Sequence, residues 1–285
     1  MKSMWDKMIS REAVGKRRRT PIRLSAILFL TIVTAAALTP ELWAPAHYAK
    51  QFREAPDHPP SGRFPLGTDA LGRDRLSRLL YGTRVSLLLA PAAATLTCVA
   101  ALVIGGTAGW AGGVTEQIVL SAADLFLSLP WFFLLIAVRA CLPLNTSPGA
   151  SVTITFTLLG LLGWAAPARI VRAAIRRLKE SDFALQAQAV GTRPLRLLLR
   201  HVAPNVMPVL LAQFWVAIPA YILAEATLGM LGLGVTEPLP SWGSILRELE
   251  AGSVTSQPWL LAPAILLASV IGCFQLVLQK EDEPA

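Results

Sequence analysis

Three charged side chains lie within or beside long apolar runs of the sequence: Asp124, Arg139 and Glu225. A charge in the hydrocarbon interior of a membrane is costly, so such residues usually face protein or a water-filled path. Glu225 is therefore the best candidate for a group that faces a translocation path, although it could instead tie two helices together. Asp124 and Arg139 favour positions at the membrane interfaces.

The other residues that could do chemistry form no recognisable catalytic or metal site. His47, His58 and His201 are too widely spaced for a set of metal ligands, and no pair of nucleophile and base indicates a membrane enzyme. The only Gly-Lys pair, Gly15-Lys16, lies in a basic tail and lacks the rest of a phosphate-binding loop. We expect no cofactor in this chain and no enzyme activity of its own.

The composition indicates a membrane protein. Of the 285 residues, 54% are hydrophobic and only 15% are charged, whereas a soluble domain has about a quarter of its residues charged. A helix needs roughly 20 apolar residues to span a bilayer. The predicted fold class is all-α, a polytopic membrane protein with one transmembrane domain, 24-279. Its six predicted spans are about 24-40, 85-110, 118-139, 150-168, 206-229 and 258-279.

The formal net charge of +8 follows the membrane spans rather than a nucleic-acid-binding surface, because the basic residues flank the apolar runs. Cytoplasmic flanks are rich in Lys and Arg. The basic tail 1-23 and the basic loop 169-205 are therefore both predicted to be cytoplasmic. Six crossings return the tail 280-285 to the same side and leave 41-84 and 234-257 as outer loops, although the first of these is also rich in basic residues.

The first apolar run also resembles a secretory signal, since basic residues up to Arg19 precede it and Ala44 and Ala46 follow it. Its long leading segment argues against cleavage, and loss of this helix would break the topology. Whether the first helix is retained stays open at the level of sequence.

Three further patterns concern packing. Asp74 can cap a helix that runs to Tyr81 and lies at the outer membrane interface. In the second span, Gly105, Gly109 and Gly113 recur at four-residue spacing, which allows another helix to approach closely. Tryptophans near the predicted span ends are typical of the aromatic belts of membrane proteins. They are Trp43, Trp110, Trp131, Trp164 and Trp242.

The basic loop predicts a small helix that stands out of the membrane. Ser181 and Asp182 are good N-cap residues, the following residues to Val190 suit a short helix, and Gly191 supplies the left-handed conformation that closes one. The preceding basic residues continue the fourth span by helical periodicity. Such a segment could act as a lever for a cytoplasmic partner, or it could lie on anionic lipid headgroups.

After this small helix a third helical stretch begins. Arg193 and Arg196 lie on one of its faces and apolar residues lie on another. Pro204 and Pro208 then predict a kink at the entry into the fifth span.

Three stretches of the chain together resemble one known family. The first is PLGTDALGRDRLSRLLYGTRVSL at 65-87, the second is Gly191 with RHVAPN at 200-205, and the third is ILAEATLGMLGLGV at 222-235 with PSWG at 240-243. They are similar to motifs of the membrane subunits of ATP-binding-cassette importers, in the oligopeptide, dipeptide and nickel group. The resemblance covers about 64-278.

The second stretch departs from the family pattern. The cytoplasmic loop motif of typical members begins Glu-Ala-Ala, but with Gly191 aligned the glutamate falls on Leu185 and the first alanine on Gln186. Only Ala187 is kept, and the downstream proline corresponds to Pro204.

The resemblance implies that Asp182 to Gly191 forms a coupling helix that docks on an ATPase. Phe183, Leu185 and Ala187 would enter a groove of the ATPase, and Arg193 and Arg196 would meet acidic residues. A leucine in place of the usual glutamate would make this contact more apolar.

The resemblance further implies a permease subunit that forms a path for peptides or similar small solutes with a second permease subunit. Two cytoplasmic ATPases would bind ATP and Mg, and an extracytoplasmic solute-binding protein would deliver the solute. The complex would lie in the inner or plasma membrane, with both termini of this chain cytoplasmic. The sequence does not distinguish peptides from nickel, which some members of the group carry.

The rival interpretation is a secondary transporter driven by an ion gradient. Such a transporter should show paired broken helices and a relay of buried acids. At the level of sequence only Glu225 supports it.

Overall fold

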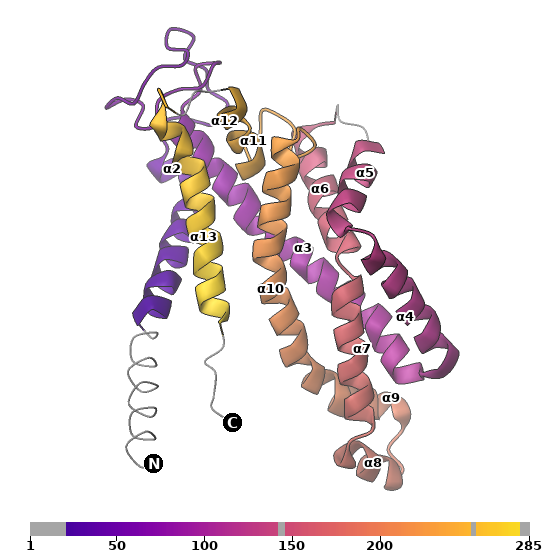
Figure 1. Cartoon of the computed structure of the whole chain (residues 1–285). Helices are drawn as coiled ribbons and strands as arrows, with labels where there is room; N and C mark the ends of the chain where they lie inside the picture. The colour runs from indigo at the N-terminus through magenta and orange to yellow at the C-terminus, as the bar shows by residue number, and fades with distance from the viewer. Residues whose placement is uncertain (1–20, 142–145, 252–254, 280–285) are drawn as a thin grey trace, which may run out of the picture. The chain divides into compact units, whose positions relative to one another are not determined.

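The computed structural model describes residues 21–141, 146–251 and 255–279 (Figure 1). Within them the chain is helical, and its only β-type pairings are the isolated bridges Gln51 to Arg73 and Thr68 to Asp74. This confirms the all-α fold class. The tail 280-285 and most of the basic tail 1-23 lie outside the described residues. The chain divides into two compact units, which are Met1–Val85 with Pro240–Ala285, and Ser86–Leu239.

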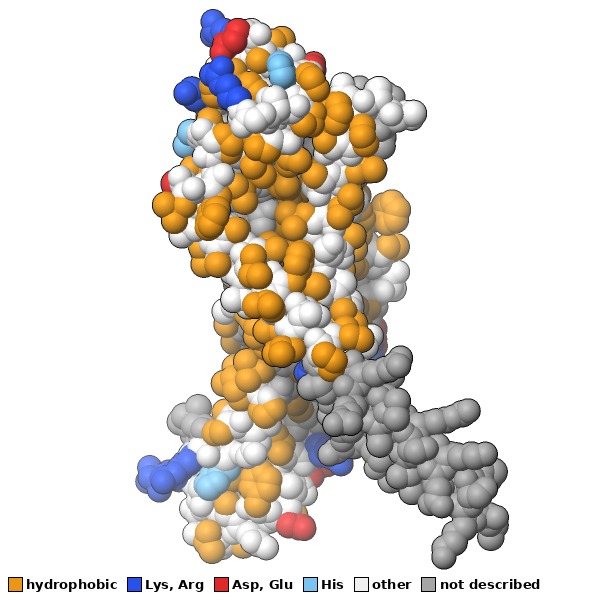
Figure 2. Space-filling view, turned by 90° about the vertical axis from the view of Figure 1, so that its left-hand side faces the viewer, with side chains coloured by type: hydrophobic (Ala, Val, Ile, Leu, Met, Phe, Trp, Pro, Cys, Tyr) orange, Lys and Arg blue, Asp and Glu red, His pale blue; other side chains and the backbone are white. Residues whose placement is uncertain are grey.

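Among the described residues, four helical stretches are long and apolar enough to cross a membrane: Pro21–Leu38, Arg75–Ala111, Arg200–Met230 and Pro258–Leu278. Two bent pairs of helices also pass this test when each pair is taken as one span, which raises the number to six. Large apolar side chains remain exposed on these helices, and Figure 2 shows them covering a broad area of one face. Lipid tails are the natural solvent for such a surface.

The two bent pairs break near a proline and a glycine. Helix α4 (Gly113–Ser128) meets α5 (Trp131–Cys141) at 84°, with Pro130 in the break. Helix α6 (Pro148–Leu162) meets α7 (Ala165–Lys179) at 43°, with Gly163 as the C-cap of α6. The sequence interpretation of 118-139 as one helix missed the first bend, although a proline inside an apolar run is a signal for it.

The helix that contains the second predicted span starts before residue 85. Helix α3 (Arg75–Ala111) is continuous, so the separate interfacial helix expected from Asp74 to Tyr81 is instead its first two turns. The capping role of Asp74 is confirmed, because its carboxylate accepts hydrogen bonds from the backbone N and the hydroxyl of Ser77 at 2.7 and 2.6 Å. Helix α3 continues through Gly82, where a Cβ would lie 2.8 Å from the Ile245 side chain.

In the first unit, the PSWG stretch packs against the start of α3. Trp242, in the short helix α11 (Trp242–Leu246), is fully buried and donates from Nε1 to the hydroxyl of Thr83 at 2.9 Å. The expectation that Trp242 anchors the chain at a lipid interface was therefore wrong. The stretches 65-87 and 240-243 form one packed structure.

Buried charges hold the loop that precedes α3 in this unit. The Asp69 carboxylate accepts hydrogen bonds from the backbone N and from Nε of Arg73, at 2.8 and 2.6 Å. Glu248, in α12 (Glu248–Ala251), pairs with Arg75 at 3.1 Å and with Arg78 at 3.6 Å. Burial raises the pKa of Glu248, and the two arginines act in the opposite direction. The remaining elements of the unit are α2 (Pro40–Trp43), η2 (Pro258–Leu261) and α13 (Ala262–Leu278).

In the second unit, the glycines of α3 allow a close approach of α7. A Cβ at Gly105 would collide with the carbonyl oxygen of Ala168, and one at Gly109 would lie 2.6 Å from the carbonyl oxygen of Arg172. Gly113 does not share this role. It starts α4 at a φ of 56°, and a Cβ at this position would have nothing within 4 Å, so its function is to turn the chain.

The loop of the second unit leads directly into the fifth span. Helix α8 (Asp182–Ala189) is followed by α9 (Pro194–Leu197), the π-helical turn η1 (Leu198–Val202) and α10 (Ala203–Met230). At the entry into the fifth span, where Pro204 and Pro208 predict a kink, the chain forms a π turn that precedes Pro204 in the first turn of α10. A π turn has hydrogen bonds between residues five apart and occurs mostly as a single turn within α-helical structure.

Candidate coupling site

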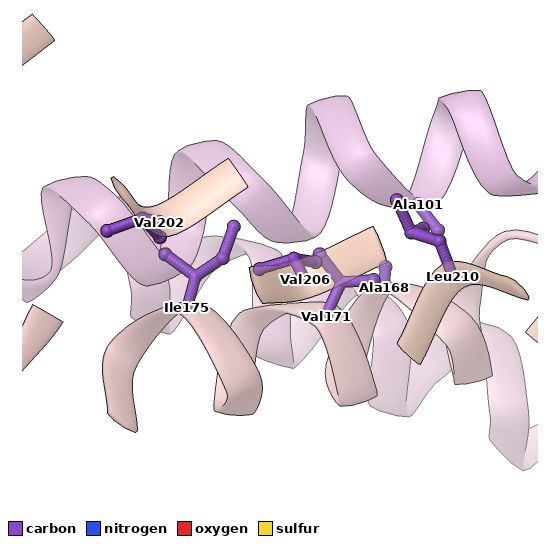
Figure 3. Close-up of a cluster of buried hydrophobic side chains, with 7 residues drawn as sticks. All are labelled: Ala101, Ala168, Val171, Ile175, Val202, Val206 and Leu210. Carbon is purple, nitrogen blue, oxygen red and sulfur yellow. The ribbon is translucent and has the colours of Figure 1, made fainter. Parts of the chain in front are cut away.

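A buried apolar cluster joins three helices next to the small helix α8. Figure 3 shows Ala168, Val171 and Ile175 of α7 facing residues of the η1 turn and of α10. The other members of the cluster are Ala101 of α3, Val202 of η1, and Val206 and Leu210 of α10. Close packing of this kind resists deformation. Helices α3, α7 and α10 are therefore packed together in this region.

A charged cluster fixes α7 to the turn between α3 and α4. Glu116 of α4 is buried and pairs with Arg172 and, at 3.1 Å, with Arg176. Lys179 donates to the backbone oxygen of Trp110 at 2.8 Å, and its ammonium lies 5.4 Å from the centre of the Trp110 ring. Arg172 and Lys179 are thus half-buried and bonded within the chain, whereas Arg169, Arg176 and Arg177 remain exposed.

Local hydrogen bonds define both ends of α8. The backbone oxygen of Ser181 accepts from the backbone N of Ala184 and Leu185, each at 3.0 Å, while its hydroxyl donates back to Leu178. The expected side-chain cap by Ser181 is therefore replaced by a bond that ends α7. At the other end Gly191 has a φ of 78°, and the N–H of Thr192 donates to Ala187 at 3.0 Å. This is the glycine-closed helix end predicted from the sequence.

Helix α8 buries little of itself. Ala184 is fully buried, but Phe183, Leu185 and Val190 are 40%, 52% and 82% exposed. Asp182 is exposed and Ala187 is half-buried. Phe183 and Leu185 lie on α8 itself, and Val190 lies just after it. Exposed large apolar side chains are a common feature of protein interaction sites.

Exposed basic residues follow α8 in the chain. Arg193 and Arg196 are exposed on either side of Pro194, and Pro204 is exposed in the first turn of α10. Figure 1 shows α8 and α9 together at the end of α7 and α10. The structure thus places the residues predicted for coupling on and around one small helix.

The three charges singled out at membrane depth have different surroundings. Asp124 is exposed and pairs with Arg169 at 2.5 Å. Arg139 is buried and donates to the Ser151 hydroxyl at 3.2 Å and to the Gly234 oxygen at 3.4 Å. The interface position expected for Arg139 does not account for this burial, which comes from its place between α5, α6 and the turn after α10.

Glu225 is fully buried on α10 and accepts a hydrogen bond from the Ser86 hydroxyl of α3 at 3.0 Å. This is the geometry of a group that ties two helices, one of the two roles that the sequence left open. It is not grouped with Asp124 or with Arg139.

The sequence matches a known family over 101–280, that of the binding-protein-dependent transport system inner membrane component. The chain belongs to this family. It is also similar to the oligopeptide transport system permease protein OppC of Bacillus subtilis (strain 168), with 30% identity over 96% of this chain and 87% of the relative. OppC of Escherichia coli (strain K12) is 31% identical over 97% of this chain and 88% of the relative. The dipeptide transport system permease protein DppC of Bacillus subtilis (strain 168) is 26% identical over 94% and 82%.

Membership of this family and the apolar helices make the chain a multi-pass membrane protein and a transport component. The bent pairs are a feature that the rival secondary transporter would share, but the family assigns the chain to binding-protein-dependent systems. Sequence reasoning missed the buried Glu116 as a structural residue. Its signal was an acid shortly after a glycine turn, opposite a helix rich in arginine.

Proposed function

We propose that this chain is a permease subunit of an ATP-driven importer for peptides. The observation that carries the proposal is similarity over nearly the whole chain to proteins named as oligopeptide and dipeptide permeases. A second permease subunit would complete the path, and a solute-binding protein would deliver the peptide from outside. The N-terminus of this chain would lie in the cytoplasm because its tail is basic, and six crossings would return the C-terminus to the same side.

The test is transport by the complete importer, purified through a tag on this chain and reconstituted in liposomes with its solute-binding protein. We expect ATP-dependent uptake of labelled dipeptides that unlabelled dipeptides inhibit and nickel does not. Inhibition by nickel alone would assign a metal substrate. Uptake driven by an ion gradient without ATP would support a secondary transporter instead.

We further propose that α8 docks on a partner ATPase, which binds ATP and Mg. The exposed Phe183 and Leu185 would enter an apolar groove, and Arg193 and Arg196 would meet acids at its rim. Because α8 follows α7 directly and α7 is fixed to α3 and α10, a movement of α8 would reach the membrane helices. At the position of Leu185, typical members of the family have a glutamate, so this contact would be more apolar in this chain.

Site-directed cross-linking tests this docking. In a background with Cys98, Cys141 and Cys273 replaced by serine, a cysteine at Leu185 should cross-link to an ATPase subunit of the intact importer. The matched control is a cysteine at Leu71, which is 53% exposed in the loop before α3, in the other compact unit. If a thiol reagent labels both introduced cysteines equally but the cysteine at position 185 forms no cross-link to an ATPase subunit, the docking is contradicted.

For Glu225 we propose the tying role, since its carboxylate is enclosed and bonded to Ser86. Glu225→Gln can keep that hydrogen bond and should retain peptide uptake, whereas Glu225→Leu should lower the thermal stability of the importer. A changed peptide preference in Glu225→Gln would instead indicate a path-facing group.

A further inference from the structure

A cavity of about 260 Å³ lies within the second unit, where both bent helix pairs break. Its wall includes Leu127 just before the α4–α5 break, Trp131 just after it, and Gly163 in the α6–α7 break. The remaining wall comes mainly from α7 and from Gln213 to Tyr221 of α10. At membrane depth, interrupted helices are tolerated where the backbone is buried in protein or lines a cavity.

The walls are mostly apolar, and part of them is aromatic. The rings of Trp131 and Tyr221 lie with centroids 6.5 Å apart and an interplanar angle of 60°. The Tyr221 hydroxyl and Thr97 are 2.6 Å apart, and Thr97 donates to the Gly160 oxygen at 2.8 Å, so Tyr221 is the donor to Thr97. A Cβ at Gly163 would collide with the Tyr221 hydroxyl. The tyrosine ring is therefore held in one position.

One polar side chain in this wall has no protein partner. Gln213 is half-buried, and its amide makes no hydrogen bond with any described residue. Its amide atoms are not buried, so they remain accessible to a ligand in the cavity. A carboxamide can donate and accept hydrogen bonds at the same time. A peptide group can form both of these bonds with it, because it has one N–H donor and one C=O acceptor. A lipid acyl chain would fill the apolar space but would leave this amide unsatisfied.

We propose that this cavity is a subsite for an apolar side chain of a transported peptide, with Gln213 hydrogen-bonded to the adjacent peptide group. The inference rests on the proposed function and names the part of the peptide that this chain recognises. Pockets for drug-sized ligands have volumes of roughly 300–1,000 Å³. A cavity of about 260 Å³ accordingly takes part of a solute rather than the whole of it.

Filling the cavity tests the apolar part of the subsite. The complete importer is reconstituted with its solute-binding protein, and ATP-driven uptake of labelled alanylphenylalanine is compared with that of alanylalanine. Ala217→Phe, which places a ring in the cavity wall, should lower the ratio of the two uptake rates about tenfold. The control Ala212→Phe adds the same ring at an exposed position of α10 outside the wall, and should change the ratio by less than about twofold.

Removing the amide tests the polar part. Gln213→Leu should lower uptake of both dipeptides about tenfold while the thermal stability of the importer stays nearly the same, because the accessible amide makes no hydrogen bond with a described residue that the change would break. A merely structural role predicts unchanged uptake. An unchanged uptake ratio in Ala217→Phe, or unchanged uptake in Gln213→Leu, would overturn the subsite. Absence of ATP-driven uptake of either dipeptide by the unaltered importer would instead overturn the proposed function.

Discussion

At the scale of single residues, Glu116 is the charge on which the position of α7 depends most directly. Its carboxylate is buried and faces two arginines, so its loss would leave positive charge near Arg172 without a partner. Breaking a buried pair by removing one partner costs about 3–5 kcal/mol, whereas an exposed pair contributes about 0–1 kcal/mol. The exposed pair of Asp124 and Arg169 offers a comparison within the same two helices.

We predict that Glu116→Gln lowers the thermal unfolding temperature of the purified importer by several degrees, and that Asp124→Asn leaves it nearly unchanged. Both changes remove one negative charge from α4, so net charge does not distinguish them. Differential scanning calorimetry or a dye-based melting curve would measure the shift. Equal shifts in the two variants would show that the Glu116 cluster does not hold α7.

Gly191 is required for its backbone conformation rather than for space. Its φ is 78°, and nothing lies within 4 Å of the position that a Cβ would occupy. Gly191→Ala should therefore destabilise the end of α8 by about 1 kcal/mol and reduce peptide uptake per ATP hydrolysed. Gly191→Asn, which tolerates the left-handed conformation better, should retain more of the coupling. Equal activity of both variants and the unaltered importer would contradict this role.

At the scale of elements, the contact between α3 and α7 depends on one face of α3. A Cβ at Gly105 would meet the Ala168 backbone, whereas one at Gly106 would make an ordinary contact with Ile175 at 3.5 Å. Gly105→Ala should force α3 and α7 apart and lower both stability and uptake, while Gly106→Ala should be tolerated. Thermal unfolding and uptake of the two adjacent variants would measure the difference. A more harmful effect of Gly106→Ala would contradict the packing.

The elements themselves were predictable to different degrees. The apolar runs predict the spans because burial in lipid requires length and apolar character, and α8 was predictable because Gly191 marks its end. The continuity of α3 was not. Its first turns look amphipathic because they pack against Trp242 and its neighbours, which lie far away in the sequence. The bend of α6 and α7 depends on room for Tyr221 beside Gly163, a contact that the local sequence does not encode.

The candidate site shows the same division. Phe183 and Leu185 are exposed, which the partner contact implied for them by the resemblance to importer subunits requires. The ion pairs of the α7 arginines could not be predicted from the sequence, since Arg172 and Arg176 could equally have faced lipid headgroups or a partner protein. Their pairing with Glu116 depends on the turn at Gly112 and Gly113, where φ is positive and α4 folds back along α7.

At the scale of the whole molecule, the membrane helices of the second unit and the small helix α8 act together. The apolar cluster and the Glu116 cluster connect α7 to α3, α4 and α10, and α8 follows α7 after a short turn. A partner that moves α8 would thus act on helices that line the proposed peptide subsite, because α7 and α10 supply part of its wall.

The most direct test of this coupling measures peptide uptake and ATP hydrolysis together in liposomes that contain the complete importer with Leu185→Arg. A buried contact at α8 would place the added charge in an apolar groove, so uptake should fall about tenfold or more while basal hydrolysis continues. The control Leu71→Arg makes the same change at an equally exposed leucine in the loop before α3 and should leave uptake unchanged. Equal uptake by Leu185→Arg and the control would contradict the coupling of transport through α8.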